Sequence, residues 1–169
     1  MLQRVKEASV AVDGQVRGAI GPGLLVLLGV GKGDDEECAT QLATKSCRLR
    51  IFDDEQGKMN RSLLDAGGAA LVISQFTLLA DTGRGLRPSY ESAERPERAR
   101  DLYERFAGEI RALGVRTETG VFGARMAVRL ENDGPVTVML ESQAKSTSHD
   151  SPAAGKDPKL QVGKASIDD

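Results

Sequence analysis

Apolar and polar residues alternate along the first twenty positions, and this alternation predicts a β-hairpin. The alternation runs through residues 2–12, Asp13-Gly14 follows, and a second alternating stretch covers 16–20. Asp-Gly between two such stretches is a strong signal of a two-residue hairpin turn. Residues 24–30 form an unbroken apolar run instead, which predicts a central strand buried on both faces.

Two later stretches have the three- and four-residue spacing of amphipathic helices. The first begins at the acidic residues 34–37 and has basic residues toward its end, a charge order that suits the helix dipole. The second starts near Pro96 and ends at Gly114. Its aromatic positions Tyr103 and Phe106 fall on the apolar stripe, so we assign both to core packing.

Further strands are predicted at residues 69–76, 115–119, 127–130 and 136–140. Strands paired by hairpins, with two main helices packed against them, indicate an α+β domain with a largely antiparallel or mixed sheet that can curl into a barrel. We expect residues 1–142 to form this domain. Residues 143–169 are rich in Ser, Lys, Asp, Pro and Gly and have no periodicity, which predicts a disordered tail.

Composition narrows the class of protein. A chain of 169 residues is long enough for one ordinary domain, and a net charge of −2 argues against binding nucleic acid through bulk positive charge, so any RNA contact must be local. There is no apolar run of about 18 residues and no signal peptide, so no membrane contact and a cytoplasmic location are expected. Cys38 and Cys47 are too far apart along one helix to bridge, and no Cys/His cluster has metal-ligand spacing, so we expect no metal and no cofactor.

The single histidine restricts the possible chemistry. His149 lies in the predicted tail, so the domain has no imidazole for a Ser-His-Asp or Cys-His arrangement. If this domain is a hydrolase, its proton transfers must be managed by other groups.

Two polar segments interrupt the strand pattern, and such local conflicts often mark functional sites. Ser74-Gln75-Phe76-Thr77 follows the buried run 70–73 and can be a ligand site, a catalytic hydroxyl or a cap at a strand end. In the second segment, Asn132 to Thr137, Gly134-Pro135 separates two strand-like stretches, because proline cannot donate to a ladder. Gly-Pro is foremost a turn signal, and only about one X-Pro bond in twenty is cis.

Two other motifs resemble ligand loops but lack essential parts. The glycine-rich segment 29–33 follows a strand and precedes a helix, yet Asp34 stands where a phosphate loop needs a hydroxyl. The acidic segment 53–55 lacks the remaining ligands of a calcium loop, and a solvated turn is expected there. Three basic residues remain as candidate phosphate contacts: Lys58, Arg84 and Arg87.

Taken together with Gln3-Arg4-Val5, the two polar segments resemble the D-aminoacyl-tRNA deacylases, the family first described as D-tyrosyl-tRNA deacylase. The resemblance extends over nearly all of residues 1–141. It includes five further motifs: Gly29-Val30-Gly31-Lys32-Gly33-Asp34, Leu49-Arg50-Ile51-Phe52, Gly57-Lys58-Met59-Asn60, Arg87-Pro88-Ser89 and Phe122-Gly123-Ala124-Arg125-Met126. The chain departs from the family pattern at Leu79, where many relatives have tyrosine, in a slightly shorter first strand, and in its tail.

The resemblance implies a homodimeric enzyme whose active site lies at the subunit interface. Its substrate is the aminoacylated 3′ end of tRNA, and it hydrolyses the ester of a D-amino acid, or of glycine mischarged on tRNA(Ala). The resemblance further implies that Gly134-Pro135 is cis and enters the partner's site, where it excludes L side chains sterically. Arg4 orients this motif with support from Asn132, and Arg4 favours the D-specific branch over the sister family that acts on L-alanyl-tRNA.

The resemblance also assigns roles within the pocket. Four residues line it and carry the catalysis: Ser74, Gln75, Phe76 and Thr77. The backbone N–H near Phe76 polarises the ester carbonyl, whereas the Thr77 hydroxyl has no neighbouring base and is weakly activated. We therefore favour the hypothesis that the substrate's 2′-hydroxyl helps to activate the attacking water while the protein supplies mainly orientation. Met126 and Arg87 are expected to contact the substrate.

A function of another class stays open. A non-catalytic dimeric module could use the same exposed loop to bind RNA or a protein, and the sister activity on L-alanyl-tRNA is a second alternative. Release of D-tyrosine but not L-tyrosine from charged tRNA separates the deacylase from both.

Overall fold

The computed structural model of the protein describes residues 1–142. The main sheet has the order β2-β1-β3-β6-β7, with β8 paired to β1. Its strands are β1 (Leu2–Val12), β2 (Gln15–Ile20), β3 (Gly23–Leu28), β6 (Ala69–Ser74), β7 (Thr117–Thr119) and β8 (Ala127–Val138), and β4 (Phe52–Asp53) pairs with β5 (Met59–Arg61). The helices are α1 (Glu36–Arg48), α2 (Leu63–Ala66), α3 (Pro96–Ala112) and the short 3₁₀ helix η1 (Phe76–Leu79). The tail predicted at 143–169 lies outside the described residues.

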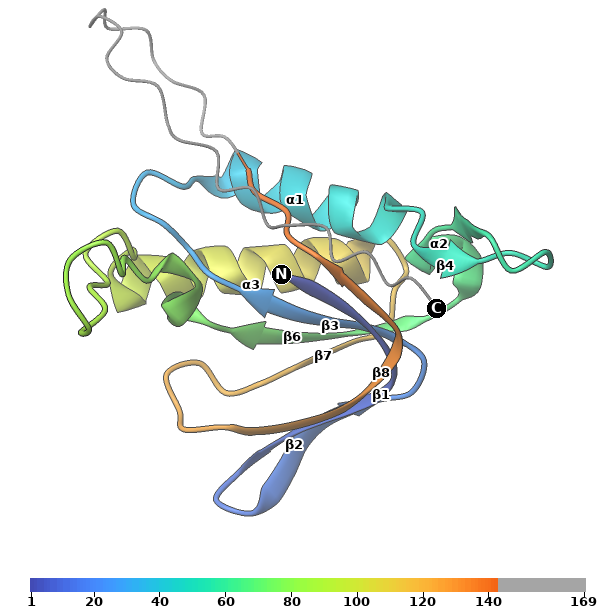
Figure 1. The fold of residues 1–169 in the computed structure, drawn as a ribbon, viewed down its shortest axis with the longest axis horizontal. Coiled ribbons are helices and arrows are strands. Elements are labelled where there is room, and N and C mark those ends of the chain that lie inside the picture. The colour runs from blue at the N-terminus through green and yellow to red at the C-terminus, as the bar shows by residue number, and fades with distance from the viewer. Residues whose placement is uncertain (143–169) are drawn as a thin grey trace, which may run out of the picture.

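The long strand β1 makes the sheet curl. Its first residues pair with β3 and its last residues with β2, while β8 pairs along nearly the whole strand. β2 and β3 therefore share one edge of β1, and the sheet bends where one gives way to the other (Figure 1). A Cβ added at Gly18 of β2 would lie 3.1 Å from the Thr119 carbonyl oxygen of β7, so β2 closes over the far side of the sheet. The predicted barrel-like sheet is confirmed.

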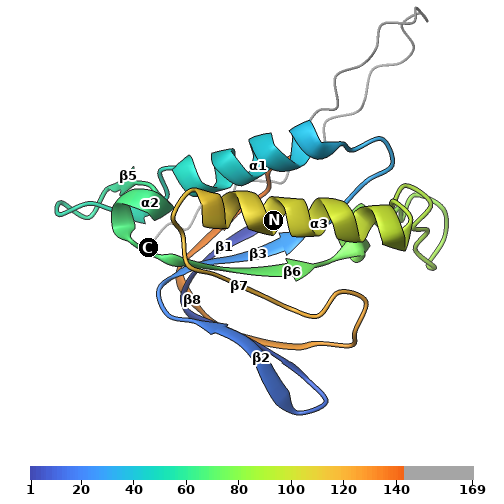
Figure 2. The ribbon, with the colours of Figure 1, turned by 180° about the vertical axis from the view of Figure 1, so that it is seen from behind.

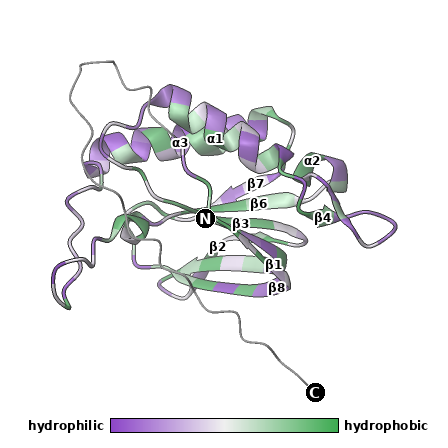
Figure 3. Cartoon of the chain, turned by 45° about the horizontal axis from the view of Figure 1, so that its top comes forward, coloured by the Kyte–Doolittle hydropathy of each residue, from purple (hydrophilic) through white to green (hydrophobic). Residues whose placement is uncertain are grey.

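The sheet is mixed because β3, β6 and β7 run parallel while β1 is antiparallel to its three neighbours. β3 and β6 pair in register from Gly23–Ala69 to Leu28–Ser74. Both strands consist almost wholly of apolar residues, as Figure 3 shows, and most of these residues are buried. The predicted central buried strand is thus β3, with α1 in the connection that leads to its parallel neighbour.

Both predicted helices lie on one face of the sheet (Figures 1 and 2). The Asp35 side chain caps α1 by accepting a hydrogen bond from the Cys38 N–H, and α3 begins at Pro96, as expected. One apolar cluster fills the space between helices and sheet, and a second, which includes Val10 and Ile73, lies inside the curl. Within residues 1–142, no helix is long and apolar enough to cross a bilayer.

The structure corrects three of the strand predictions. The strand expected to reach Phe76 ends at Ser74, because η1 begins at Phe76. The two strands expected on either side of Gly134-Pro135 are one strand, β8, which keeps its pairing with β1 before and after the proline. The strand predicted at 115–119 is shorter and covers Thr117–Thr119.

Candidate active site

A cavity of about 500 Å³ lies at the carboxyl end of β6. Ser74, Gln75 and Phe76 form one side of it. Residues of α3 and of the segment 122–126 form much of the remainder, and Met126 is among them. Four of the residues expected at the substrate pocket therefore come together in one cavity.

The backbone changes direction directly beside this cavity. The Gln75 N–H donates to the Leu28 carbonyl at 2.7 Å, which extends the parallel ladder by one residue, and η1 then begins at Phe76. The first N–H groups of a helix have no acceptor within the helix, so the Phe76 N–H remains for another partner at the cavity edge. The backbone changes direction here because the apolar run of β6 ends, and the polar residues that follow leave the sheet.

Thr77 lies just beyond, with Gln75 as its side-chain partner in the described part of the chain. The Gln75 Nε2 donates to the Thr77 Oγ1. A carboxamide cannot take up a proton, so this contact orients the Thr77 hydroxyl without activating it as a nucleophile.

Two aromatic side chains, Tyr103 and Phe122, also line the cavity. The Tyr103 hydroxyl donates to the Val72 carbonyl at 2.8 Å, and burial raises the pKa of Tyr103 to about 12, so it is a neutral phenol at physiological pH. Its ring lies 5.7 Å from that of Phe122, and the Arg100 guanidinium lies 5.3 Å from the Phe122 centroid. The sequence pattern predicts only a packing role for Tyr103, because a residue on a core stripe has no signal that distinguishes a cavity wall.

The loop that follows η1 borders the cavity, but not every residue of this region that was expected to contact the substrate lines it. Phe76, with 57% of its surface exposed, packs edge-on against Tyr90 at 5.0 Å between ring centroids. Arg87 lies in the same exposed loop and does not line the cavity. Lys58 lies in the β4–β5 hairpin, at the opposite end of the molecule from this loop (Figure 1).

The second polar segment forms a bulge in β8. Gln3 pairs with Thr137 and Val5 with Asn132, so the four residues 133–136 stand opposite Arg4 alone. The Gly134-Pro135 peptide bond is cis, and both residues are exposed. The segment is therefore neither a simple turn between two strands nor a regular strand.

Arg4 of the neighbouring strand β1 binds this bulge. Only 5% of the Arg4 surface is exposed, and its Nε donates to the Asp133 carbonyl oxygen at 3.2 Å and lies 3.0 Å from the Asp133 carboxylate. Its Nη1 donates to the Ile51 carbonyl at 2.8 Å and to the Asp53 carboxylate at 3.1 Å. A buried guanidinium requires such partners, and Asp53 is one that the sequence did not reveal.

The bulge and the cavity lie apart within one chain. β8, β1, β3 and β6 are successive neighbours, so three strand spacings, about 14 Å along the sheet, separate β8 from β6 at the level of the bulge, and β8 reaches the cavity only near its other end, at Val128. Arg4 is level with Leu24 and, through it, with Ala70, four residues before Ser74. Gly134 and Pro135 accordingly do not line the cavity of their own chain.

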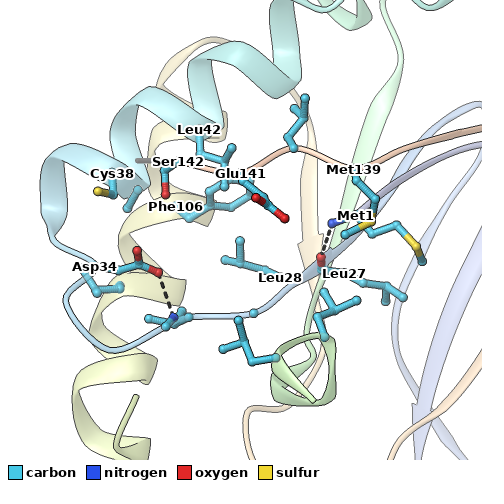
Figure 4. A pocket seen from close by; sticks show the side chains of 18 of the residues that line it. Met1, Leu27, Leu28, Asp34, Cys38, Leu42, Phe106, Met139, Glu141 and Ser142 are labelled. Carbon is cyan, nitrogen blue, oxygen red and sulfur yellow. Dashed lines mark hydrogen bonds between the residues drawn. The ribbon is translucent and has the colours of Figure 1, made fainter. Parts of the chain in front are cut away.

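A second cavity, of about 260 Å³, lies between the end of β3, the start of α1 and residues 139–142 (Figure 4). At its edge the Asp34 carboxylate accepts a hydrogen bond from the Gly31 N–H at 2.8 Å. The glycine-rich loop is therefore closed by its own acidic residue, which agrees with the rejection of a phosphate loop. Ser74, Gln75 and Phe76 do not line this cavity.

Two cysteines lie in the described part of the chain. Cys38 and Cys47 are free thiols, and burial raises the pKa of Cys47 to about 11. Among residues 1–142, no three His, Cys, Asp or Glu side chains are grouped closely enough to hold a metal ion.

Comparison with known proteins identifies the family. Residues 1–141 match the family model described as D-Tyr-tRNA(Tyr) deacylase. The chain belongs to this family. A protein of Roseiflexus castenholzii is 61% identical over 142 residues, which cover 84% of this chain and 90% of the relative. A protein of Koribacter versatilis is 58% identical over 143 residues, which cover 85% and 96%, and both relatives are named D-aminoacyl-tRNA deacylase.

Solved structures share the fold of this chain. The structure titled c-Myc DNA Unwinding Element Binding Protein has a TM-score of 0.79 and 39% sequence identity, and the match covers 84% of this chain and 97% of that one. A probable eukaryotic D-amino acid tRNA deacylase has a TM-score of 0.68 at 18% identity, over 79% and 93% of the two chains, and shows the shared fold alone. The predictions of deacylase family, hydrolase class and α+β fold are confirmed.

Proposed function

We propose that the protein hydrolyses the ester bond of D-aminoacyl-tRNA, and of glycyl-tRNA mischarged on tRNA(Ala), in the cytoplasm. Membership of the deacylase family supports the reaction class. The observation that carries the proposal is the cavity at the end of β6, whose volume of about 500 Å³ suits a nucleoside-sized ligand. Its polar edge is formed by Ser74, Gln75 and Phe76, and its aromatic wall by Tyr103 and Phe122.

In the proposed reaction the ester carbonyl lies next to the Phe76 N–H, and water attacks the carbonyl carbon. The carbonyl oxygen becomes an oxyanion, which the N–H stabilises by a hydrogen bond. Collapse of this intermediate breaks the bond to the ribose oxygen, which takes a proton, and the free amino acid leaves. The substrate's 2′-hydroxyl assists the water, so the protein acts mainly by orientation.

This mechanism assigns Thr77 to binding and not to nucleophilic attack. The hydrogen bond from Gln75 to Thr77 and the absence of histidine from residues 1–142 support that assignment. We expect Thr77→Ala to keep measurable turnover of D-tyrosyl-tRNA in single-turnover assays. Complete loss of turnover, with binding of a non-hydrolysable substrate analogue intact, would contradict the mechanism.

We further propose that Gly134 and Pro135 act on the cavity of a second copy of the chain in a homodimer. The exposure of both residues and their distance from the cavity of their own chain support this arrangement. Their carbonyl oxygens would then crowd the side of the α-carbon where an L side chain projects. Discrimination would come from exclusion of L substrates, not from attraction to a particular D side chain.

The decisive experiment measures release of amino acid from purified D-tyrosyl-tRNA, L-tyrosyl-tRNA and glycyl-tRNA(Ala). We expect hydrolysis of the first and third substrates and none of the second above the spontaneous rate. A protein inert toward all three would contradict the proposal, and turnover of an L substrate alone would favour the sister activity.

Binding of nucleic acid without hydrolysis is a second candidate function. One observation favours it, namely that a structural relative with 39% identity is named for binding a DNA element. An inert protein that binds uncharged RNA or DNA in a mobility-shift assay would support this candidate over the deacylase.

A further inference from the structure

The base of the β8 bulge is bridged by one side chain of β1. The Gln3 Nε2 donates to the Asn132 Oδ1 at 2.7 Å, and the Thr137 Oγ1 donates to the Gln3 Oε1 at 2.7 Å. Asn132 and Thr137 are the paired residues that flank the bulge on either side. The Gln3 carboxamide therefore joins the two ends of the segment that contains Gly134-Pro135.

This bridge compensates for missing ladder bonds. Residues 133–136 face a single residue of β1, so the regular pairing that fixes a strand is interrupted there. A carboxamide carries a donor and an acceptor on opposite sides, which is what an amide oxygen at one end and a hydroxyl at the other require. Methionine, which is of similar length, could bind neither end.

Gln3 and Arg4 hold the bulge in complementary ways. Successive side chains of a strand point to opposite faces, so the two residues approach the segment from different sides of β1. Arg4 binds Asp133 within the bulge, whereas Gln3 binds the residues at its two ends. Together they fix both the position of the bulge and its width.

We infer that Gln3 is a positioning residue for chiral discrimination. It keeps the bulge at the width, and Gly134-Pro135 in the position, that exclude an L side chain. This inference rests on the proposed function, in which the motif forms the wall of the partner's pocket. Gln3 touches no reacting atom in this arrangement and acts through Asn132 and Thr137.

The test is Gln3→Met, with kcat/KM measured on D-tyrosyl-tRNA and L-tyrosyl-tRNA. We expect the L-to-D ratio of kcat/KM to rise about tenfold, because the variant loses both bridging hydrogen bonds and a tenfold change corresponds to about 1.4 kcal/mol, within the range for two exposed bonds. Gln3→Glu should restore the ratio to within about twofold of wild type, since its carboxylate accepts from the Thr137 hydroxyl and from a turned Asn132 amide.

The matched control is Lys6→Met. Lys6 donates to the Glu131 carboxylate at 2.9 Å, so this variant also removes a side-chain contact between β1 and β8, but outside the bulge. We expect its L-to-D ratio to equal that of wild type. Thr137→Val, which removes one of the two bridging bonds at almost constant volume, tests the same idea if Gln3→Met does not fold.

The outcomes separate this inference from the proposed function. If wild type discriminates between the substrates and both Gln3→Met and Thr137→Val keep its ratio, the role of Gln3 is refuted while the function stands. An equal rise in Lys6→Met also refutes it, because general loosening of β8 would then suffice. If wild type hydrolyses neither substrate, the proposed function itself fails.

Discussion

The end of β6 and the bulge of β8 are the two polar segments of the domain, and different interactions hold them in place. β6 lies within the sheet, and its residues Ala70 to Ile73 are at most 1% exposed, so the backbone that leads to Ser74 is fixed by core packing. The bulge is exposed at Gly134 and Pro135 and depends on hydrogen bonds from Gln3 and Arg4.

This difference suggests a division of labour. A backbone fixed by buried strands tolerates changes of single polar side chains, because many contacts share the task of positioning it. A bulge held by two residues loses its geometry when either is replaced. We therefore expect single substitutions to reduce catalysis at the cavity only slightly and to reduce discrimination at the bulge strongly.

The strongest way to break the bulge is Arg4→Met. The substitution removes a buried guanidinium that binds Ile51, Asp53 and Asp133, and it leaves the buried Ile51 carbonyl without this donor. Because both carboxylates are partly exposed and can bind water instead, we expect the free energy of unfolding to fall by about 3 kcal/mol, the lower end of the range for a broken buried ion pair. Urea titration measures this, with Lys6→Met, an exposed pair, changing it by less than about 1 kcal/mol.

A comparison of two glycines tests the bulge against the cavity directly. Gly134 has φ +119°, and an added Cβ would lie 2.9 Å from the Val136 Cγ2, whereas Gly123, in the cavity wall, has φ +77° and open space around its Cβ position. Both substitutions by alanine strain the backbone, but only the first adds a clash. We expect losses of about 2 kcal/mol for Gly134→Ala and about 1 kcal/mol for Gly123→Ala, measured by urea unfolding. Equal losses would show that the bulge is free to adjust.

The cavity wall should tolerate Tyr103→Phe. This variant keeps the buried ring and loses the hydrogen bond to the Val72 carbonyl. We expect about 1 kcal/mol less stability at pH 8 and deacylation within about threefold of wild type. A much larger loss of activity at unchanged stability would assign the hydroxyl a direct role in the reaction.

Alkaline pH should diminish the advantage of Tyr103 over phenylalanine. The folded pKa of Tyr103 is raised to about 12, above the ordinary value near 10, so its hydroxyl stabilises the fold fully below pH 10. Above that pH the unfolded chain loses the proton first, and the contribution disappears as the pH rises toward 12. Urea titrations at pH 8 and 11 should show the difference between wild type and Tyr103→Phe shrinking.

Local patterns predicted most of the elements but not the contacts that join distant segments. The run at 24–30, the hairpin turn at Asp13-Gly14 and the stripe of α3 each depend on neighbours in the chain, and the structure contains β3, the β1–β2 hairpin and α3 where they were expected. The pairing of Asp53 with Arg4 joins residues 49 positions apart, and nothing in either local sequence indicates it.

The amino-acid sequence alone determined the polar character of the two segments, the family to which the chain belongs and the order of the main strands and helices along the chain, because hydrophobic periodicity and turn residues act over a few positions. The tertiary structure alone decided that β8 continues through Pro135 as a bulge, that Tyr103 forms a cavity wall, and that the bulge lies away from the cavity of its own chain. These features depend on the register between β1 and β8 and on the curl of the sheet. Both arise only when strands distant in sequence pack against one another.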